Sequence, residues 1–201
     1  MSALLLSLPY SPNIFWLQNF VKHNSVIVEQ EENFVKSSFR NRCEIAGANG
    51  KQLLTIPIIG GRDHHQLYKE VKIANTGNWQ KKHWQSIRSA YGSAPYFEFY
   101  AHKFEPLYNT EFELLFEFNK ELLNATLTAL KLNKPFEFTS VYKKEPTGAV
   151  DLRNDKQANS STKYYQVFAE RNGFISNLCA FDLIFNEGNR SGEVIAPSRL
   201  F

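Results

Sequence analysis

The polar residues best suited to chemistry in this chain begin with a charged segment between residues 29 and 42. Glu29 and Asn33 could accept hydrogen bonds from substrate hydroxyls, and Arg40 and Arg42 follow them closely. A guanidinium group binds phosphate or carboxylate through two parallel hydrogen bonds. The segment follows a predicted strand, and ligands of open sheets bind at the carboxyl ends of strands, so it is a candidate anion site. The alternative is a surface ion-pair cluster that contributes little to stability.

A second group of polar side chains lies in the segment WQKKHWQSIRSAY, from Trp79 to Tyr91. Helical spacing places Trp79, His83 and Ser86 on one stripe, so an imidazole lies beside a hydroxyl and an indole. Histidine has a pKa that suits general base catalysis near neutral pH, and an indole offers a stacking face to a sugar ring. The alternative is a core histidine whose hydrogen bonds are satisfied within the fold.

Asp182 lies inside the apolar segment LCAFDLIF, where burying a carboxylate without a partner is costly. Three interpretations stay open: an ion pair with an arginine, which ranks first because buried charges are normally paired, a side chain that faces water, and a site residue. Cys43 and Cys179 show no CxxC spacing, so we expect buried thiols rather than a zinc site or a disulfide. A cysteine nucleophile is a weaker hypothesis, and Cys43 suits it better because two arginines precede it.

The chain lacks the motifs that identify common enzyme classes. It has no Gly-rich phosphate loop, no GxSxG hydrolase turn and no HExxH zinc motif. The pair His64 and His65 lies in a polar segment, and adjacent side chains point in different directions, so we expect a solvated loop rather than a metal site. No metal is therefore predicted, and the cofactor stays unknown.

Length and composition indicate a globular chain: it has 201 residues, of which 43% are hydrophobic and 21% charged. A net charge of +3 is small for a dedicated nucleic-acid-binding protein, so we expect a small-molecule substrate and no nucleic-acid partner. No apolar run approaches the length of a membrane span, and the first residues lack a basic signal-peptide region, so we predict a cytoplasmic protein. The 17 Phe, 9 Tyr and 3 Trp could fill a core or line a pocket equally well. Oligomeric state stays open.

Apolar patterning predicts the elements that must position these residues. Strands are predicted over residues 3–8, 25–30, 67–73 and 136–142, and an Asn-Gly turn predicts a hairpin from Cys43 to Ile58. Helices are predicted after Asn13, from Trp79 to about Tyr91, from about 110 to 130, and over 178–185. Residues 143–162 turn polar and are the best candidate for a mobile loop. This order of elements predicts an α+β fold with a mixed sheet, a β-hairpin and several packed helices, in a single domain over residues 1–201.

Four ordered segments of the chain resemble the WbqC-like protein family. They are LPYSP at residues 8–12, EQEENFVKSSFRNRCEI at 29–45, WQKKHWQSIRSAYGSAPYFEFY at 79–100 and YYQVFAERNGFISNLCAFDLIFNEG at 164–188. The chain departs from the family pattern at Leu8, where a glutamine is common. The family is bacterial and is often found among surface-polysaccharide genes, so the resemblance implies a transferase that acts on a nucleotide-linked or amino sugar.

The residues and the resemblance together suggest an enzyme of O-antigen-like polysaccharide biosynthesis that transfers an acyl or aminoacyl group. Arg40 and Arg42 would hold a phosphate, and the candidate catalytic residues are His83, as general base, and Glu29. The expected substrate-binding residues are Tyr10, Asn33, Arg40, Arg42, Trp79, Tyr91 and Asp182. The alternative is a non-catalytic carbohydrate- or nucleotide-binding protein, or an accessory subunit, which keeps the aromatic and arginine contacts but needs no base.

Overall fold

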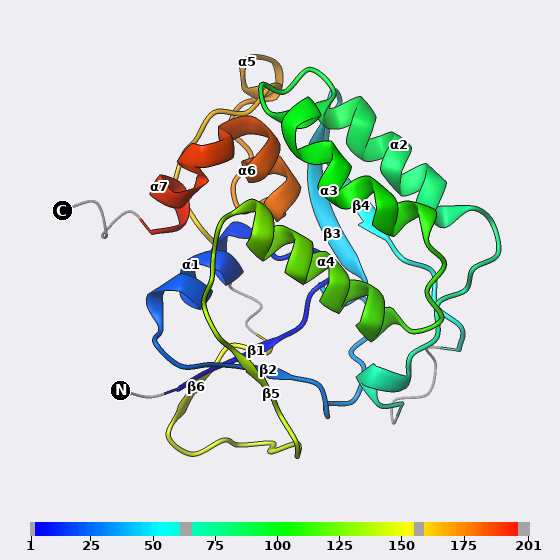
Figure 1. Cartoon of the computed structure of the whole chain (residues 1–201), viewed down its shortest axis with the longest axis vertical. Helices are drawn as coiled ribbons and strands as arrows, with labels where there is room; N and C mark the ends of the chain where they lie inside the picture. Colours follow the sequence, from blue (N-terminus) through cyan, green and yellow to red (C-terminus); the bar gives the residue numbers. More distant parts are fainter. Residues whose placement is uncertain (1–2, 61–65, 155–158, 197–201) are drawn as a thin grey trace.

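Four parallel strands, two from the N-terminal part of the chain and two from residues 137–151, form one sheet. The computed structural model describes residues 3–60, 66–154 and 159–196. Within them, β1 (Ala3–Ser7), β2 (Val26–Glu29), β5 (Glu137–Phe138) and β6 (Ala149–Asp151) lie in the order β5-β2-β1-β6. All neighbouring pairs are parallel, so their carboxyl ends lie along one edge, and Figure 1 shows the sheet below the helices. The apolar strands predicted over 3–8 and 25–30 are confirmed as β1 and β2.

An antiparallel hairpin forms a second, separate sheet. β3 (Arg42–Gly47) pairs with β4 (Gly50–Thr55) in the register Arg42↔Thr55 and Gly47↔Gly50, which leaves Ala48 and Asn49 as the loop. Gly50 has φ +101°, a conformation that side chains rarely adopt, and this explains why the turn carries Asn-Gly. The predicted hairpin is confirmed, and the predicted mixed sheet is divided between this hairpin and the parallel sheet.

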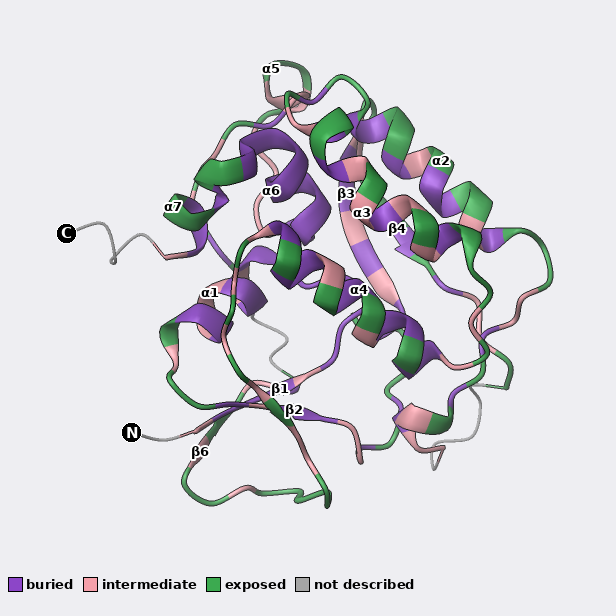
Figure 2. Ribbon diagram, in the orientation of Figure 1, coloured by how far each residue is buried: buried purple, intermediate pink, exposed green. Residues whose placement is uncertain are grey.

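Helices cover the hairpin and the sheet and supply most of the core. The helical elements are α1 (Ile14–Lys22), α2 (Trp79–Tyr91), α3 (Phe97–Asn109), α4 (Leu115–Ala129), α5 (Ala169–Asn172), α6 (Ala180–Glu187) and α7 (Ser191–Ile195), with short 3₁₀ turns η1 (Tyr68–Glu70) and η2 (Gly188–Arg190). Every residue of α6 is buried, so this helix lies inside the core, as Figure 2 shows. The α+β fold class and its packing into one domain are confirmed.

One predicted helix begins later than expected, and one predicted strand is absent. The helix predicted from about 110 to 130 is confirmed as α4, but it begins at Leu115, and α3 precedes it although Pro106 lies in its interior. Burial of Phe97, Tyr100 and Phe104 on one face stabilises α3 despite the proline. The strand predicted over 67–73 is replaced by η1 and isolated bridges, because that segment pairs with several separate chain segments rather than with one strand.

The polar segment 143–162, predicted to be a loop, contains the strand β6. Its residues pair with β1 in the register Ala3↔Ala149 to Leu5↔Asp151. The segment therefore contributes to the edge of the sheet at which β1 and β2 end. The strand predicted over 136–142 is confirmed only at β5.

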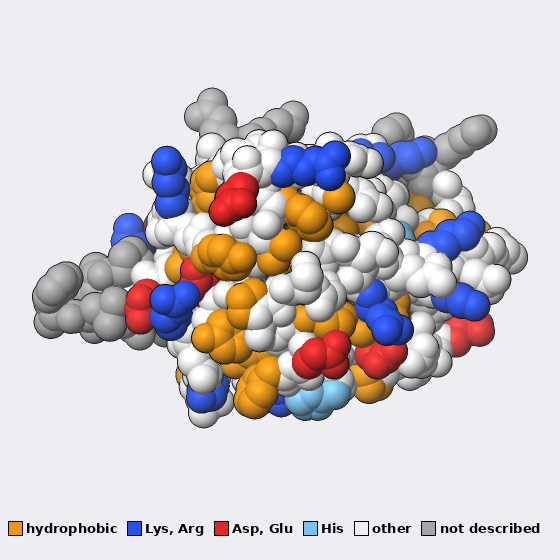
Figure 3. Space-filling view, turned by 90° about the horizontal axis from the view of Figure 1, so that it is seen from above, with side chains coloured by type: hydrophobic (Ala, Val, Ile, Leu, Met, Phe, Trp, Pro, Cys, Tyr) orange, Lys and Arg blue, Asp and Glu red, His pale blue; other side chains and the backbone are white. Residues whose placement is uncertain are grey.

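The outer face of the helical layer combines apolar and charged side chains. Figure 3 shows this face from above, with exposed apolar side chains among Lys, Arg, Asp and Glu. In the described ranges, none of the helices combines the length and apolar character needed to cross a bilayer.

Candidate functional site

A cavity of about 600 Å³ opens at the carboxyl ends of β1 and β6. Its lining comes from the residues after β1, the first turn of α1, the connection between β2 and β3, the hairpin, and residues 152–154. β1 lies in the middle of the sheet, and β2 and β6 pair with its two sides. A crevice at the carboxyl ends of parallel strands is where open sheets with helical connections bind ligands. We call this cavity the β1–β6 pocket.

Arg40 forms part of the pocket wall, but its charge is already neutralised. Its guanidinium group is buried and donates through Nε to Glu32 Oε1 at 2.7 Å, with a second bond from Nη2 to Glu32 Oε2. Nη2 also donates to Ser7 Oγ at 2.7 Å and to Asn154 Oδ1 at 3.2 Å. Arg40 thus ties the ends of β1 and β6 to the β2–β3 connection.

Arg42 has the opposite surroundings. It begins β3, lines the pocket, and has a buried Nε atom without a hydrogen-bond partner among the described residues. Lys36 also lines the pocket, and neither cation forms an ion pair within the part of the chain that the structure describes. The pocket therefore carries positive charge that no carboxylate of the described chain balances directly.

Glu44 is the carboxylate among the described residues that line the pocket. It lies two residues after Arg42 on β3, so both side chains lie on the polar face of the strand while Cys43 and Ile45 point into the core. Its Oε2 accepts a hydrogen bond from Lys51 Nζ at 3.0 Å, in a partly exposed pair. Glu44 thus places a carboxylate, paired with a lysine through one oxygen, at the wall of the pocket.

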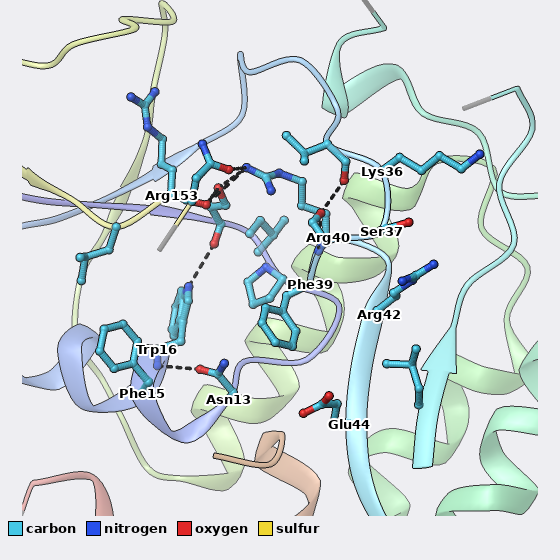
Figure 4. Close-up of a pocket in the computed structure, with 18 residues that line it drawn as sticks. Asn13, Phe15, Trp16, Lys36, Ser37, Phe39, Arg40, Arg42, Glu44 and Arg153 are labelled. Carbon is cyan, nitrogen blue, oxygen red and sulfur yellow. Dashed lines mark hydrogen bonds between the residues drawn. The ribbon is translucent and has the colours of Figure 1, made fainter. Parts of the chain in front are cut away.

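Aromatic and aliphatic side chains form the remaining walls. Phe15 and Trp16 come from the first turn of α1, and Figure 4 shows them on the side opposite Arg42 and Glu44 of β3. The Trp16 indole is fixed, because Nε1 donates to the Ser7 carbonyl at 3.0 Å and the ring stacks on Phe20 at a centroid distance of 5.1 Å. Aromatic side chains therefore form one wall of the pocket, and Arg42 and Glu44 belong to another.

Glu29 does not line the pocket. Its buried carboxylate accepts hydrogen bonds from Arg153 Nη1 at 3.0 Å and from the Glu31 backbone N–H at 2.8 Å. Arg153 also pairs with Asp151 at 2.7 Å. Glu29 and Arg153 thus join the ends of β2 and β6, and the catalytic role predicted for Glu29 stays a prediction for a residue that is fully occupied by structural contacts.

His83 also lies outside the pocket lining, in a buried hydrogen-bonded chain. Its Nδ1 is 2.9 Å from the hydroxyl oxygen of Tyr10, which is in turn 2.8 Å from that of Tyr108. Burial lowers the pKa of His83 to about 4, and a backbone hydrogen bond at Thr55 offsets this only in part. The imidazole is therefore neutral at pH 7 and already hydrogen-bonded, which matches the core-histidine interpretation. Its role as general base stays a prediction.

The remaining predicted aromatic residues are core residues. Tyr10, Trp79 and Tyr91 are buried, and none of them lines the β1–β6 pocket. Trp79 packs edge-on against His83 at a centroid distance of 5.2 Å, and Tyr91 accepts a hydrogen bond from the Ala46 backbone at 3.1 Å. Burial raises the pKa of Tyr10 and of Tyr91 well above the usual value. Tyr10, Trp79 and Tyr91 therefore belong to the core, where Tyr91 contacts the hairpin, and not to the wall of the pocket.

Asp182 is buried in α6, and the prediction that it forms an ion pair with an arginine is wrong. Its Oδ2 accepts hydrogen bonds from Tyr164 Oη at 2.7 Å and from Gln166 Nε2 at 2.8 Å, and within the described ranges no arginine or lysine pairs with it. Burial raises its pKa to about 6, although these hydrogen bonds lower it. Neutral donors therefore replace the expected ion pair because α6 is enclosed by apolar elements.

The structure brings two of the nine predicted site residues, Arg40 and Arg42, into the pocket. Asn33 is exposed in the connection after β2, and its backbone bridges to Leu67. Sequence reasoning missed Glu44, Phe15 and Trp16. The alternation of polar and buried residues along RCEIA could have placed Glu44 beside Arg42.

The described residues offer no alternative metal or thiol centre. In the described ranges there is no cluster of three or more His, Cys, Asp or Glu side chains placed to hold a metal ion, and His64 and His65 lie outside those ranges. Cys43 and Cys179 are free and buried. Burial raises the pKa of Cys43 well above the usual value, which opposes the thiolate that a cysteine nucleophile needs.

Two comparisons relate the chain to known sequences. A model of the WbqC-like protein family matches residues 9–162, a range that contains most of the pocket lining. The chain is 29% identical over 143 residues to the uncharacterized protein Rv1507c of Mycobacterium tuberculosis (strain ATCC 25618 / H37Rv). The match covers 69% of this chain and 60% of the relative, so the chain spans less than two thirds of that protein's length. No solved structure matches the chain.

Proposed function

Because the chain belongs to the WbqC-like protein family, we propose that it modifies a nucleotide-linked or amino sugar in bacterial surface-polysaccharide biosynthesis and binds a phosphate-bearing substrate in the β1–β6 pocket. The association of the family with surface-polysaccharide genes supports the pathway. The position of the pocket at the carboxyl ends of parallel strands supports the site.

The proposal of a phosphate-bearing substrate rests on one observation, the buried Nε of Arg42 that has no hydrogen-bond partner among the described residues. A buried donor on a cation loses its hydration without recovering a hydrogen bond, and this costs about 1–3 kcal/mol or more. A phosphate oxygen would accept from Nε while a second oxygen accepts from a terminal nitrogen of the same guanidinium group. Arg40 does not compete for the ligand because Glu32 already occupies it.

The proposed reaction is acyl or aminoacyl transfer. The amine or hydroxyl of the sugar attacks the acyl carbon of an activated donor, a new C–N or C–O bond forms, and the bond to the leaving group breaks. The proton of the attacking group passes to Glu44 and then to the leaving group. In this proposal Glu44 takes the role that the sequence assigns to His83, since Glu44 lines the pocket.

Thermal-shift measurements against nucleotide sugars, free nucleotides and acyl-coenzyme A species test the proposal. A ligand at 100 times its Kd adds about 2.7 kcal/mol to the free energy of unfolding, which corresponds to a rise in Tm of about 5–10 °C at this chain length. Arg42→Met should abolish the shift. Arg88→Met removes the same charge from an exposed position of α2 outside the pocket and should retain it. Equal shifts in both variants would refute the Arg42 site.

A second candidate function, non-catalytic binding of the same ligand, is favoured by one observation. The described lining contains no histidine or cysteine, and His83 is buried elsewhere. Incubation of the protein with the stabilising ligand and an acceptor sugar, followed by mass spectrometry, separates the two functions. An acylated sugar whose formation is lost in Glu44→Gln supports the enzyme, and binding without any product supports the non-catalytic protein.

A further inference from the structure

Besides its cationic side chains, the β1–β6 pocket has an exposed apolar surface that a phosphate group does not contact. Val35, Phe39 and Leu53 line it, and they are 42%, 43% and 49% exposed. They come from two segments, the connection between β2 and β3 and the strand β4, and they meet at one cavity. Large apolar side chains that gather on a concave surface gain free energy when a ligand covers them.

The aliphatic side chains of Val35 and Leu53 favour hydrocarbon rather than a sugar ring. Val35 and Leu53 have no aromatic face for stacking and no hydrogen-bonding group for a hydroxyl. A sugar placed against them would lose hydration of its hydroxyls without recovering hydrogen bonds. An alkyl or acyl chain would be buried there at no such cost.

Arg42, rather than the helix that enters the pocket, offers an unpartnered donor to an anion. The first N–H groups of α1 are already satisfied: Ile14 donates to the Leu178 carbonyl, Phe15 to Asn177 Oδ1 and Trp16 to Asn13 Oδ1. The helix N-terminus therefore has no free donors at these positions for an anion. Among the side chains of the described residues that line the pocket, the Nε of Arg42 is the buried donor without a hydrogen-bond partner.

The hairpin register sets the spacing between the two ends. Leu53 is the cross-strand partner of Glu44, which lies two residues from Arg42 on β3. Two residues along a strand span about 7 Å, and directly opposed side chains lie on the same face. Leu53 therefore lies on the same face of the hairpin as Arg42, about 7 Å further along the strands.

We infer that the substrate of the β1–β6 pocket is a phosphate-bearing amphiphile, in which an alkyl or acyl chain lies close to the phosphate. Arg42 binds the phosphate, and Phe39, Val35 and Leu53 cover the chain. The inference rests on the proposed function, because it names the acyl-bearing substrate of the same site. It assigns this pocket to the acyl donor and leaves the sugar acceptor to approach from the open side, where Glu44 lies.

Calorimetric titration with inorganic phosphate, methyl phosphate, butyl phosphate and hexyl phosphate tests the inference. Affinity should rise about two- to fourfold for each added methylene, up to the length at which the chain leaves the apolar wall. 1-Butanol, which lacks the phosphate, should not bind. Leu53→Ser and Phe39→Ser should each reduce the gain per methylene and leave the affinity for methyl phosphate unchanged. Tyr165→Ser removes a similarly exposed apolar side chain outside the pocket and should leave both quantities unchanged.

The outcomes separate the inference from the proposed function. Binding of phosphate and methyl phosphate that is lost in Arg42→Met but does not strengthen with chain length would keep the phosphate site and overturn the amphiphile. A chain-length gain that persists in both Leu53→Ser and Phe39→Ser would also overturn it, because the chain would lie elsewhere. Absence of binding to every compound would overturn the phosphate site and the inference together. Thermal unfolding curves confirm that each variant is folded.

Discussion

Arg40 and Arg42 are two positions apart, and the fold gives their guanidinium groups opposite surroundings. Glu32 pairs with Arg40 through two hydrogen bonds in a buried site, whereas Arg42 has a buried donor without a partner among the described residues. A buried ion pair stabilises the fold only while both members are present, since either one alone is an uncompensated charge. These surroundings favour a structural role for Arg40 and support the proposal that Arg42 binds a ligand.

Glu32→Gln should lower the free energy of unfolding by about 3–5 kcal/mol, because it leaves the Arg40 cation buried without a counter-charge. Glu31→Gln is the matched control. The carboxylate of Glu31 pairs with Lys69 in a partly exposed site, so we expect the free energy of unfolding to change by less than about 1 kcal/mol. Urea denaturation of both variants measures the difference. Similar losses in the two variants would contradict the structural role of the Glu32–Arg40 pair.

Two buried groups make the stability depend on pH in opposite directions. Burial raises the pKa of Asp182 from 3.8 to about 6, so its stabilising contribution is complete below pH 3.8 and is lost as the pH rises through 6. Burial lowers the pKa of His83 from 6.5 to about 4, so its contribution is complete above pH 6.5 and is lost as the pH falls through 4. Each amounts to about 3 kcal/mol, and the two nearly cancel between pH 4 and pH 6.5.

Asp182→Asn should isolate the contribution of Asp182 to the pH dependence of stability, because His83 is the same in both chains. The stability of the variant relative to the original chain should be most favourable at pH 7–8 and should decline by up to about 3 kcal/mol as the pH falls to 4, because only the original chain regains a neutral, buried carboxyl group. Urea denaturation from pH 4 to pH 8 measures this difference. A difference that does not vary with pH would contradict the raised pKa of Asp182.

At the scale of elements, the sequence predicts those whose signals are local. The helix Trp79–Tyr91 has the predicted bounds, because its apolar spacing and the following Gly92 act within one segment. The hairpin is predicted by its turn. α3 and β6 are missed because distant partners stabilise them: α3 packs against α2, α4 and α6, and β6 pairs with β1. Of the pocket, the sequence predicts only Arg40 and Arg42 as site residues, for the same reason: Trp16 reaches the pocket through a tertiary contact and not through a motif.

Gly50→Ala should destabilise the chain by about 1–2 kcal/mol. An added Cβ meets no atom within 4 Å, so the cost arises from the φ of +101° that the turn requires. Gly192→Ala in α7 is the control, because it is equally free of contacts and has an ordinary φ. The control should be neutral or stabilising by up to about 1 kcal/mol. Thermal unfolding measures both, and an equal effect would show that the turn does not require glycine.

At the scale of the whole molecule, the last third of the chain completes a core that the earlier elements begin. Phe181 packs edge-on against Phe104 at 5.1 Å, and Phe185 lies 5.0 Å from Phe97, so α6 joins α3 from the middle of the chain. The family match ends at residue 162, before α6 begins. The pocket likewise combines residues that lie far apart in sequence, from Ser7 to Asn154. Its geometry therefore depends on the complete core.

A chain that ends at residue 162 should lose cooperative unfolding, although it retains the matched family region and the pocket lining. Removal of α6 exposes the aromatic surfaces of α2 and α3 that it covers, and losing even one buried Phe costs about 3–5 kcal/mol, a large part of the 5–15 kcal/mol that stabilises a typical domain. Circular dichroism during thermal denaturation measures the transition.

In the full chain, Phe185→Ala should lower Tm strongly, whereas Tyr165→Ala, at a half-exposed position, should change it little. A shortened chain with a sharp transition near the original Tm would mean that the region up to residue 162 folds independently and that α6 only packs onto its surface.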